Sequence, residues 1–355
     1  MIPPDTKVLI LHNKLMDYRI PIWNLIAKTC DLTVAYCEGK GHDGCDFKTI
    51  RLKEPHRIGP LAWHPDNIRK LCKGYDVVII SGLTRWIKYM LLPFGPHKFK
   101  TAIWALGVSA SYSKGFDQHH TWDFVRDFFY KKNDACIFYT DYVVRKNLKR
   151  GYDGKRMFVA HNTVQVLPLL PDVAKDSILF IGTLYKAKGI QTLLNAYKSA
   201  YGKRSDLPTL NIVGGGEEYG QIEAWINDAG LNDKIIMHGS IYDKAAKRDL
   251  FQKAYACISP NQAGLSVLES LGYGVPFITR KNAITGGEIF NISDGKTGLL
   301  LDDDSQFETA IIDIAANPDK YIGMGQKAIN YYQDNCTPEI MAQGLIDAID
   351  FLASN

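Results

Sequence analysis

Three glycine-containing turns in the second half of the chain carry the residues best suited to bind an anion. The first holds Gly182, Thr183 and Lys188, and the second holds Gly214 and Gly216. Glycine lets a ligand approach the backbone, and the N–H groups at a helix start, together with a lysine, form a phosphate cradle. The alternative interpretation is that these glycines only permit tight turns from strand to helix.

The third turn adds a carboxylate. Gly264 precedes a predicted helix that begins at about Leu265, and Glu269 lies one turn into that helix. A carboxylate one turn below a phosphate-binding helix start is well placed for the hydroxyls of a ribose, although elsewhere it would be an ordinary surface glutamate. The three turns in this order together indicate a nucleotide site more strongly than any one of them does.

The elements that must position these turns follow from the alternation of short apolar runs with longer amphipathic stretches, which is typical of βαβ units and a parallel sheet. Strands are expected at residues 7–12, 31–37, 76–81, 100–106, 135–140 and 157–162, and again at 177–183, 209–216, 234–240, 256–261, 275–280 and 297–302. Helices are expected at residues 18–28, 141–151 and 338–355. A proline-containing segment at 164–177 reads as a linker.

Two such runs predict an α/β protein with two doubly wound, Rossmann-like domains that face a cleft. We expect a first domain at residues 1–165, a second at 166–337, and a terminal helix at 338–355 that packs back towards the first domain. A length of 355 residues fits two domains.

Composition narrows the class of protein. The seven cysteines are scattered without a CxxC pair or a zinc-like Cys/His spacing, which favours reduced thiols and no structural metal. The first apolar run, at residues 8–11, is too short for the core of a signal peptide. No stretch approaches the roughly 18 apolar residues that a membrane helix needs. We therefore expect a soluble, cytoplasmic protein that can still touch the inner face of the cell membrane.

The net charge of +4 hides an asymmetry between the two halves. Residues 1–165 hold 26 Lys and Arg against 15 Asp and Glu, a net of +11, and the remainder holds 16 against 23, a net of −7. The first half is thus expected to meet something anionic. No nucleic-acid motif accompanies the dispersed cations, so an anionic membrane is the better candidate. Two segments, 86–100 and 145–150, are candidates for contact with such a membrane. The alternative is that they are ordinary helices with a solvated basic edge.

The order of these motifs resembles the retaining, GT-B type of glycosyltransferase family 4 (glycosyl transferases group 1). The resemblance rests on GTLYKAKG (182–189), GGG (214–216), NQAGLSVLESLGYGVPF (261–277) and GGEIFNISDGKTGLL (286–300), and in the first half on residues 18–28 and 139–164. It covers essentially the whole chain and implies the GT-B fold of two Rossmann-like domains.

The resemblance also implies roles at the donor side. Lys188 matches the lysine that holds the donor diphosphate, and Glu269 matches the second glutamate of a Glu-x7-Glu pair, which binds the ribose. Gly182 would let the backbone approach the diphosphate. Ala263, Gly264 and Leu265 match the family positions whose backbone N–H groups contact the donor sugar and its phosphate. Ser240 and Ile241 match the family positions that contact the base of the nucleotide.

Three positions depart from the family pattern. Thr183 stands where an arginine is usual, which removes a bidentate phosphate clamp, and Lys186 or Arg19 are the candidate substitutes. Asn261 replaces the first glutamate of the pair, and its amide can still bind sugar hydroxyls. On the acceptor side, WALG at 104–107 keeps Trp104 but has a leucine where some relatives have histidine.

The implied activity is transfer of a sugar from a nucleotide diphosphate to a hydroxyl of a glycan or lipid-linked acceptor, with retention of configuration, in cell-surface polysaccharide biosynthesis such as capsule or O-antigen. No cofactor and no metal is expected, because fixed positive groups would stabilise the leaving diphosphate. Two alternatives stay open: a catalytically degenerate GT-B subunit that binds glycans in an assembly complex, and a GT-B epimerase or phosphorylase.

Overall fold

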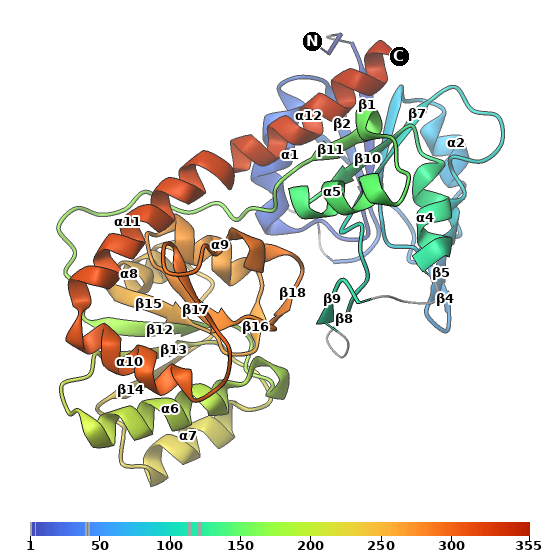
Figure 1. Cartoon of the computed structure of the whole chain (residues 1–355). Helices are drawn as coiled ribbons and strands as arrows, with labels where there is room; N and C mark the ends of the chain where they lie inside the picture. Colours follow the sequence, from blue (N-terminus) through green and yellow to red (C-terminus); the bar gives the residue numbers. More distant parts are fainter. Residues whose placement is uncertain (1, 4, 40, 42, 112–114, 119–122) are drawn as a thin grey trace. The chain divides into compact units, whose positions relative to one another are not determined.

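The computed structural model describes residues 2, 3, 5–39, 41, 43–111, 115–118 and 123–355, and it divides the chain into two compact units (Figure 1). Unit 1 comprises Met1–Ser109, Asp117–Asn162 and Thr337–Asn355, and unit 2 comprises Ala110–Phe116 and Thr163–Cys336. Each unit is built on one parallel sheet with helices packed against it, so the predicted α/β class with two Rossmann-like domains is confirmed.

The sheet of unit 1 has seven parallel strands in the order β11-β10-β7-β6-β1-β2-β3. Its strands are β1 (Lys7–Leu11), β2 (Asp31–Tyr36), β3 (Lys48–Arg51), β6 (Val77–Ser81), β7 (Lys100–Ala105), β10 (Ala135–Phe138) and β11 (Met157–Val159). All five residues of β6, VVIIS, are buried. A central parallel strand needs such a continuous apolar run because both of its faces are covered.

The helices of unit 1 are α1 (Ile20–Ala27), α2 (Ile68–Cys72), α3 (Ile87–Met90), α4 (Asp123–Lys131), α5 (Asp141–Lys149) and α12 (Pro338–Ser354). The last of these, α12, lies beside α1 although more than 300 residues separate them (Figure 1). Its buried face joins the same apolar core as Trp23 and Ile10, through Met341, Leu345, Ile349 and Leu352.

The sheet of unit 2 has six parallel strands in the order β14-β13-β12-β15-β17-β19. They are β12 (Ser177–Ile181), β13 (Thr209–Val213), β14 (Ile235–Gly239), β15 (Ala254–Ile258), β17 (Phe277–Arg280) and β19 (Gly298–Leu301). The helices around them are α6 (Ile190–Lys203), α7 (Tyr219–Asp228), α8 (Lys244–Lys253), α9 (Leu265–Gly272), α10 (Gln306–Ala316) and α11 (Pro318–Asn335).

Three short strand pairs were not expected from the sequence. They are β4 (His56–Ile58) with β5 (Leu61–Trp63), β8 (Ala110–Ser111) with β9 (Gly115–Phe116), and β16 (Gln262–Ala263) with β18 (Ile284–Thr285). Each strand has only two or three residues, which is too short for a period-two pattern to stand out.

The two basic segments of unit 1 combine buried or paired side chains with exposed ones. In residues 86–100, Trp86, Tyr89 and Met90 are buried, because α3 packs its apolar side into the unit. In residues 145–150, Arg150 pairs with Asp127, 2.7 Å away, and Lys146 pairs with Asp117. Leu91 and Leu148 are 41% and 49% exposed, so each segment still has an apolar side chain at the surface, and its membrane role stays a prediction.

Candidate functional site

The glycines of the first two turns lie against one another at the carboxyl ends of β12 and β13. A Cβ on Gly214 would stand 1.9 Å from the carbonyl oxygen of Gly182, and a Cβ on Gly216 would stand 2.2 Å from that of Leu184. Hydrogen bonds join the two backbone segments, from Gly182 N to Val213 O and from Leu184 N to Gly215 O, both of 2.9 Å. Only glycine allows this close approach of two backbones.

Lys188 ends the short 3₁₀ helix Lys186–Lys188 directly before α6, and it is 8% exposed. Its Nζ lies 2.8 Å from the point where a Cβ on Gly182 would be, so the amine rests over the glycine turn. Burial lowers the pKa of Lys188. Within the described part of the chain its amine has neither a hydrogen bond nor an ion pair. A buried ammonium group without a partner is stabilised when an anion binds beside it, so Lys188 is suited to hold an anionic ligand.

Asn261 is brought to the same place by β15 and the residues that follow it. Its backbone N–H donates to the carbonyl oxygen of Lys188 over 3.3 Å. Its side-chain amide packs on Gly189, where a Cβ would meet the amide nitrogen at 2.4 Å. Gly189, at φ 71°, is the residue before α6, and the left-handed backbone there also favours glycine. The Asn261 Oδ1 atom is buried and has no hydrogen-bond partner among the described residues.

The third turn is open above its glycine. Ala263 is buried in β16, Gly264 precedes α9, and Leu265 is the first residue of that helix, as predicted. No described atom outside the adjacent residues lies within 4 Å of the point where a Cβ on Gly264 would stand. The structure therefore leaves room for a ligand to approach the backbone at this helix start.

Glu269 lies one turn into α9 and is already paired. Lys247, on α8, donates from Nζ to its Oε1 over 2.6 Å, and the two side chains are 21% and 13% exposed. The sequence had not singled out Lys247, because it lies 22 residues away on another helix. Nearby Cys257 is no candidate nucleophile, since burial raises its pKa to about 12.

The remaining donor-side candidates lie at the margin of this cluster. Thr183 and Lys186 are exposed. Ser240, after β14, places its Oγ 2.6 Å from the point where a Cβ on Gly215 would be, and Ile241 is half-buried beside it. The structure thus brings Gly182, Lys188, Gly214, Gly216, Ser240 and Asn261 to one edge of unit 2, while their roles stay predictions.

Unit 1 gathers its own group at the carboxyl ends of β1, β7 and β10. Arg19, 4% exposed, has its guanidinium carbon 5.1 Å from the ring centre of Trp104 and 5.0 Å from that of Tyr18. The guanidinium donates to Asn162 Oδ1 over 2.9 Å and to Met341 Sδ over 2.8 Å. Trp104 is buried, and its indole nitrogen has no hydrogen-bond partner among the described residues.

His12 belongs to this group, and the sequence analysis missed it. Its ring lies 6.4 Å from that of Trp104, and its Nδ1 lies 2.8 Å from the carbonyl oxygen of Lys14. The backbone N–H of Lys14 also lies 3.3 Å from Nδ1, so Nδ1 donates to the carbonyl in one tautomer and accepts from the N–H in the other. Burial, and then the charge of Arg19, lower the pKa of His12 to about 4. Its place directly after the first strand was the signal that could have identified it.

Comparison with known proteins finds a family model that matches the second half of the chain. Residues 169–331 match the family model described as glycosyl transferases group 1, and this range lies wholly within unit 2. No curated protein matches the sequence.

Solved structures of similar fold match nearly the entire chain. HepE from Anabaena, in complex with UDP and glucose, has a TM-score of 0.72 at 13% identity, over 99% of this chain and 100% of that one. TarM from S. aureus, a variant in complex with fondaparinux, alpha-GlcNAc-glycerol and UDP, scores 0.67 at 11% identity, over 97% and 100%. WaaG, a glycosyltransferase involved in lipopolysaccharide biosynthesis, scores 0.63 at 14% identity, over 98% and 100%. The chain therefore has the GT-B fold, and residues 169–331 of its second unit match the model of the glycosyl transferases group 1.

Proposed function

We propose that the chain transfers a sugar from a nucleotide diphosphate to a hydroxyl of a glycan or lipid-linked acceptor, with retention of anomeric configuration. The observation that carries this proposal is Lys188, a buried amine that has no anionic partner among the described residues and lies over the glycine turn at Gly182. Backbone N–H groups at Gly264 and Leu265 and the carboxylate of Glu269 complete a site for a diphosphate and a ribose.

In the proposed reaction the bond between the anomeric carbon and the phosphate oxygen breaks, and its electron pair stays on the phosphate. The acceptor oxygen attacks from the same face, and its proton passes to the departing phosphate oxygen. No protein nucleophile or metal is required, because Lys188 and the helix N–H groups stabilise the charge that develops on the diphosphate. Adding a chelator should accordingly leave the transfer rate unchanged.

A donor panel tests the activity and identifies the nucleotide. Thermal-shift measurements with UDP, GDP, CDP, ADP and dTDP should show one nucleotide that stabilises the protein most, because a ligand that binds only the folded state adds stability by mass action. Transfer from the matching sugar nucleotide, with the product configuration read by NMR, then tests retention. No shift with any nucleotide, or an inverted product, would contradict the proposal.

Asn261 offers a sharper test of the sugar end of the site. Its Oδ1, which has no hydrogen-bond partner among the described residues, lies beside Gly189 and Lys188, where a donor sugar would meet the protein. We expect Asn261→Glu to change the preference among donor sugars by tenfold or more while nucleotide affinity changes less than threefold. Asn330→Glu, on α11, is the matched control. Equal effects on sugar preference and nucleotide affinity would remove Asn261 from the sugar position.

The acceptor and the location follow from the basic character of unit 1. We place the reaction in cell-surface polysaccharide biosynthesis at the cytoplasmic face of the membrane, with an anionic or lipid-linked acceptor and peripheral association through unit 1. The involvement of WaaG, a protein of the same fold, in lipopolysaccharide biosynthesis supports this choice. No helix among the described residues has the length and apolar character to cross a bilayer.

A second function, a catalytically inactive binding subunit, is favoured by two residues. Thr183 replaces a phosphate-clamping arginine and is exposed, and Asn261 replaces a glutamate. Hydrolysis or transfer of the preferred donor by the purified protein would exclude this alternative. Nucleotide binding without either reaction would support it.

A further inference from the structure

One face of unit 1 carries large apolar side chains that the fold leaves exposed. On the β4–β5 hairpin, Ile58 is 74% and Trp63 is 46% exposed, and after α3 Leu91 is 41% exposed. On α4, Phe124 is 68% and Phe128 is 53% exposed, one helical turn apart. We call these five residues the hairpin–α4 face.

Contacts within unit 1 join the hairpin to α4. The Ala62 N–H donates to the carbonyl oxygen of Arg85 over 2.8 Å, which ties β5 to the segment before α3. Lys88, on α3, holds its Nζ 5.1 Å from the ring centre of Trp63. Beyond Leu91, the ring of Phe94 lies 5.7 Å from that of Phe128. The exposed residues therefore follow a connected path along one part of unit 1.

Cations without carboxylate partners are interleaved with this path. Lys132 lies 5.8 Å from the ring centre of Phe128. Among the described residues, Lys88 donates only to the carbonyl oxygen of Asp66, and Arg69 only to carbonyl oxygens of the 91–94 segment. None of these three cations forms an ion pair within the residues that the structure describes. No carboxylate among the described residues therefore neutralises their positive charge.

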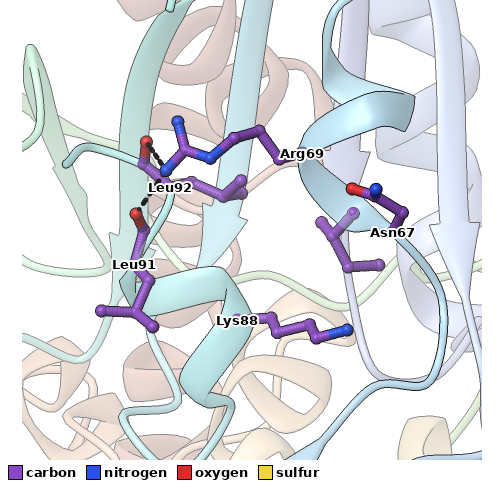
Figure 2. A pocket seen from close by; sticks show the side chains of 6 residues that line it. Asn67, Arg69, Lys88, Leu91 and Leu92 are labelled. Carbon is purple, nitrogen blue, oxygen red and sulfur yellow. Dashed lines mark hydrogen bonds between the residues drawn. The ribbon is translucent and has the colours of Figure 1, made fainter. Parts of the chain in front are cut away.

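A hollow of about 350 Å³ opens between the start of α2 and the end of α3. Figure 2 shows it bordered by Asn67 and Arg69 on one side and by Lys88, Leu91 and Leu92 on the other. Nη1 of Arg69 is buried there and has no hydrogen-bond partner among the described residues. An apolar hollow with two cations at its border matches a phosphate headgroup joined to acyl chains.

We propose that the hairpin–α4 face docks on an anionic lipid bilayer. Arg69, Lys88 and Lys132 meet the headgroup phosphates, and the aromatic and aliphatic side chains enter the boundary between headgroups and acyl chains. A protein partner fits less well, because lysine is depleted at the centres of protein interfaces, whereas aromatic, aliphatic and basic residues together are typical of membrane surfaces.

The charge of unit 1 agrees with this partner. With α12 included, unit 1 holds 25 Lys and Arg against 18 Asp and Glu, a net of +7. This is smaller than the +11 of residues 1–165, because Thr337–Asn355 adds three acidic residues and no basic one, and because one lysine lies in the 110–116 stretch of unit 2. The attraction must therefore come from the local cations rather than from the unit as a whole, and salt should weaken it steeply. The inference deepens the proposed membrane association and rests on it, but its test needs no transferase activity.

The test is sedimentation of the full chain with vesicles of phosphatidylcholine, with and without 30% phosphatidylglycerol. We expect binding to the anionic vesicles at least tenfold stronger than to the neutral ones, and weaker in high salt. Phe124→Ser with Phe128→Ser should weaken binding at least tenfold, and Lys88→Gln with Lys132→Gln should reduce both the binding and its salt dependence. Ile322→Ser, 46% exposed on α11 in unit 2, is the matched control and should bind as the unchanged chain does.

Two further measurements keep the outcome decisive. If the Phe124→Ser, Phe128→Ser variant does not fold, Ile58→Ser at the exposed hairpin tip replaces it in the binding assay. In the second measurement, vesicles of brominated lipid should quench tryptophan fluorescence of the unchanged chain, and the quenched component should be missing in Trp63→Phe. Equal binding of the variants and the unchanged chain would overturn the proposal. The proposal would also be overturned if the unchanged chain were a dimer and Phe124→Ser with Phe128→Ser made it a monomer, because the hairpin–α4 face would then bind a second copy of the chain. Vesicle binding with no nucleotide binding would instead overturn only the proposed transferase function.

Discussion

The carboxyl ends of the strands present different groups in the two sheets: backbone in unit 2 and side chains in unit 1. In unit 2 the edge is mostly backbone, with Gly182, Gly214 and Gly216 packed closely enough that no side chain fits between them. In unit 1 the edge is mostly side chains, with the Arg19 guanidinium among aromatic rings and His12 beside it. A backbone edge suits a ligand part that is always the same, such as a diphosphate, while a side-chain edge suits a part that varies between relatives.

The strongest test of the backbone edge is Gly214→Ala. Its Cβ would stand 1.9 Å from the Gly182 carbonyl oxygen, so β12 and β13 must separate at their ends. We expect the free energy of unfolding to fall by about 3–4 kcal/mol and the nucleotide-induced thermal shift to vanish. Gly220→Ala, in α7 with open space around it, is the control and should stabilise by about 0.5–1 kcal/mol. A Gly214→Ala chain as stable as the unchanged one would contradict the packing.

Lys188→Met separates ligand binding from stability. We expect transfer to fall about a hundredfold, or about 3 kcal/mol of transition-state stabilisation, while the Tm of the free protein rises, because an unpaired buried amine opposes folding. Lys327→Met, exposed on α11, should change neither.

The same residue gives the backbone edge a pH dependence. Because burial lowers the pKa of Lys188, nucleotide affinity should fall with rising pH earlier than it would for an exposed lysine. Calorimetric titration between pH 7 and 10 measures this fall, and Lys188→Met should abolish it. A pH profile shared by both chains would assign the effect to another group.

The side-chain edge is tested by Arg19→Lys. A lysine ammonium cannot keep the contacts to Asn162 and Met341 together with the contacts to the aromatic rings. The free energy of unfolding, measured with urea, should therefore fall by about 2 kcal/mol. We expect nucleotide affinity to change less than threefold, because the guanidinium is committed within unit 1. A tenfold loss would instead make Arg19 the phosphate clamp that Thr183 cannot be.

The smallest expected effect is at His12. Its pKa of about 4 lies below the ordinary value, so between pH 6.5 and 4 the unfolded chain binds a proton that the folded chain does not. Stability should therefore fall as the pH drops through this window, by about 1 kcal/mol for this partly exposed ring. His12→Asn keeps a donor for the Lys14 carbonyl and should lessen the fall between pH 7 and 5 relative to the unchanged chain. An identical fall in both chains would assign it to another group, such as buried His64.

The sequence predicted the parallel sheets because each central strand is a short run of β-branched and aliphatic residues, as in VVIIS of β6. It also located the glycine turns, because each occupies a few consecutive residues. It could not predict the Lys247 contact to Glu269 or the gathering of His12, Trp104 and Tyr139 around Arg19, since those pairs depend on how helices and strands pack. The same reason explains why the burial of Trp86 and Tyr89 was not predicted, since a pattern of mixed aromatics and lysines does not reveal it.

The position of α12 has a consequence for the order in which the chain matures during synthesis. Except for 110–116, unit 2 is one continuous stretch, whereas unit 1 needs Thr337–Asn355 to cover Trp23 and Ile10. A growing chain therefore emerges with the first sheet made early and its last covering helix made latest. Unit 1 must wait, with part of its apolar core uncovered, until the ribosome has released the segment that closes it.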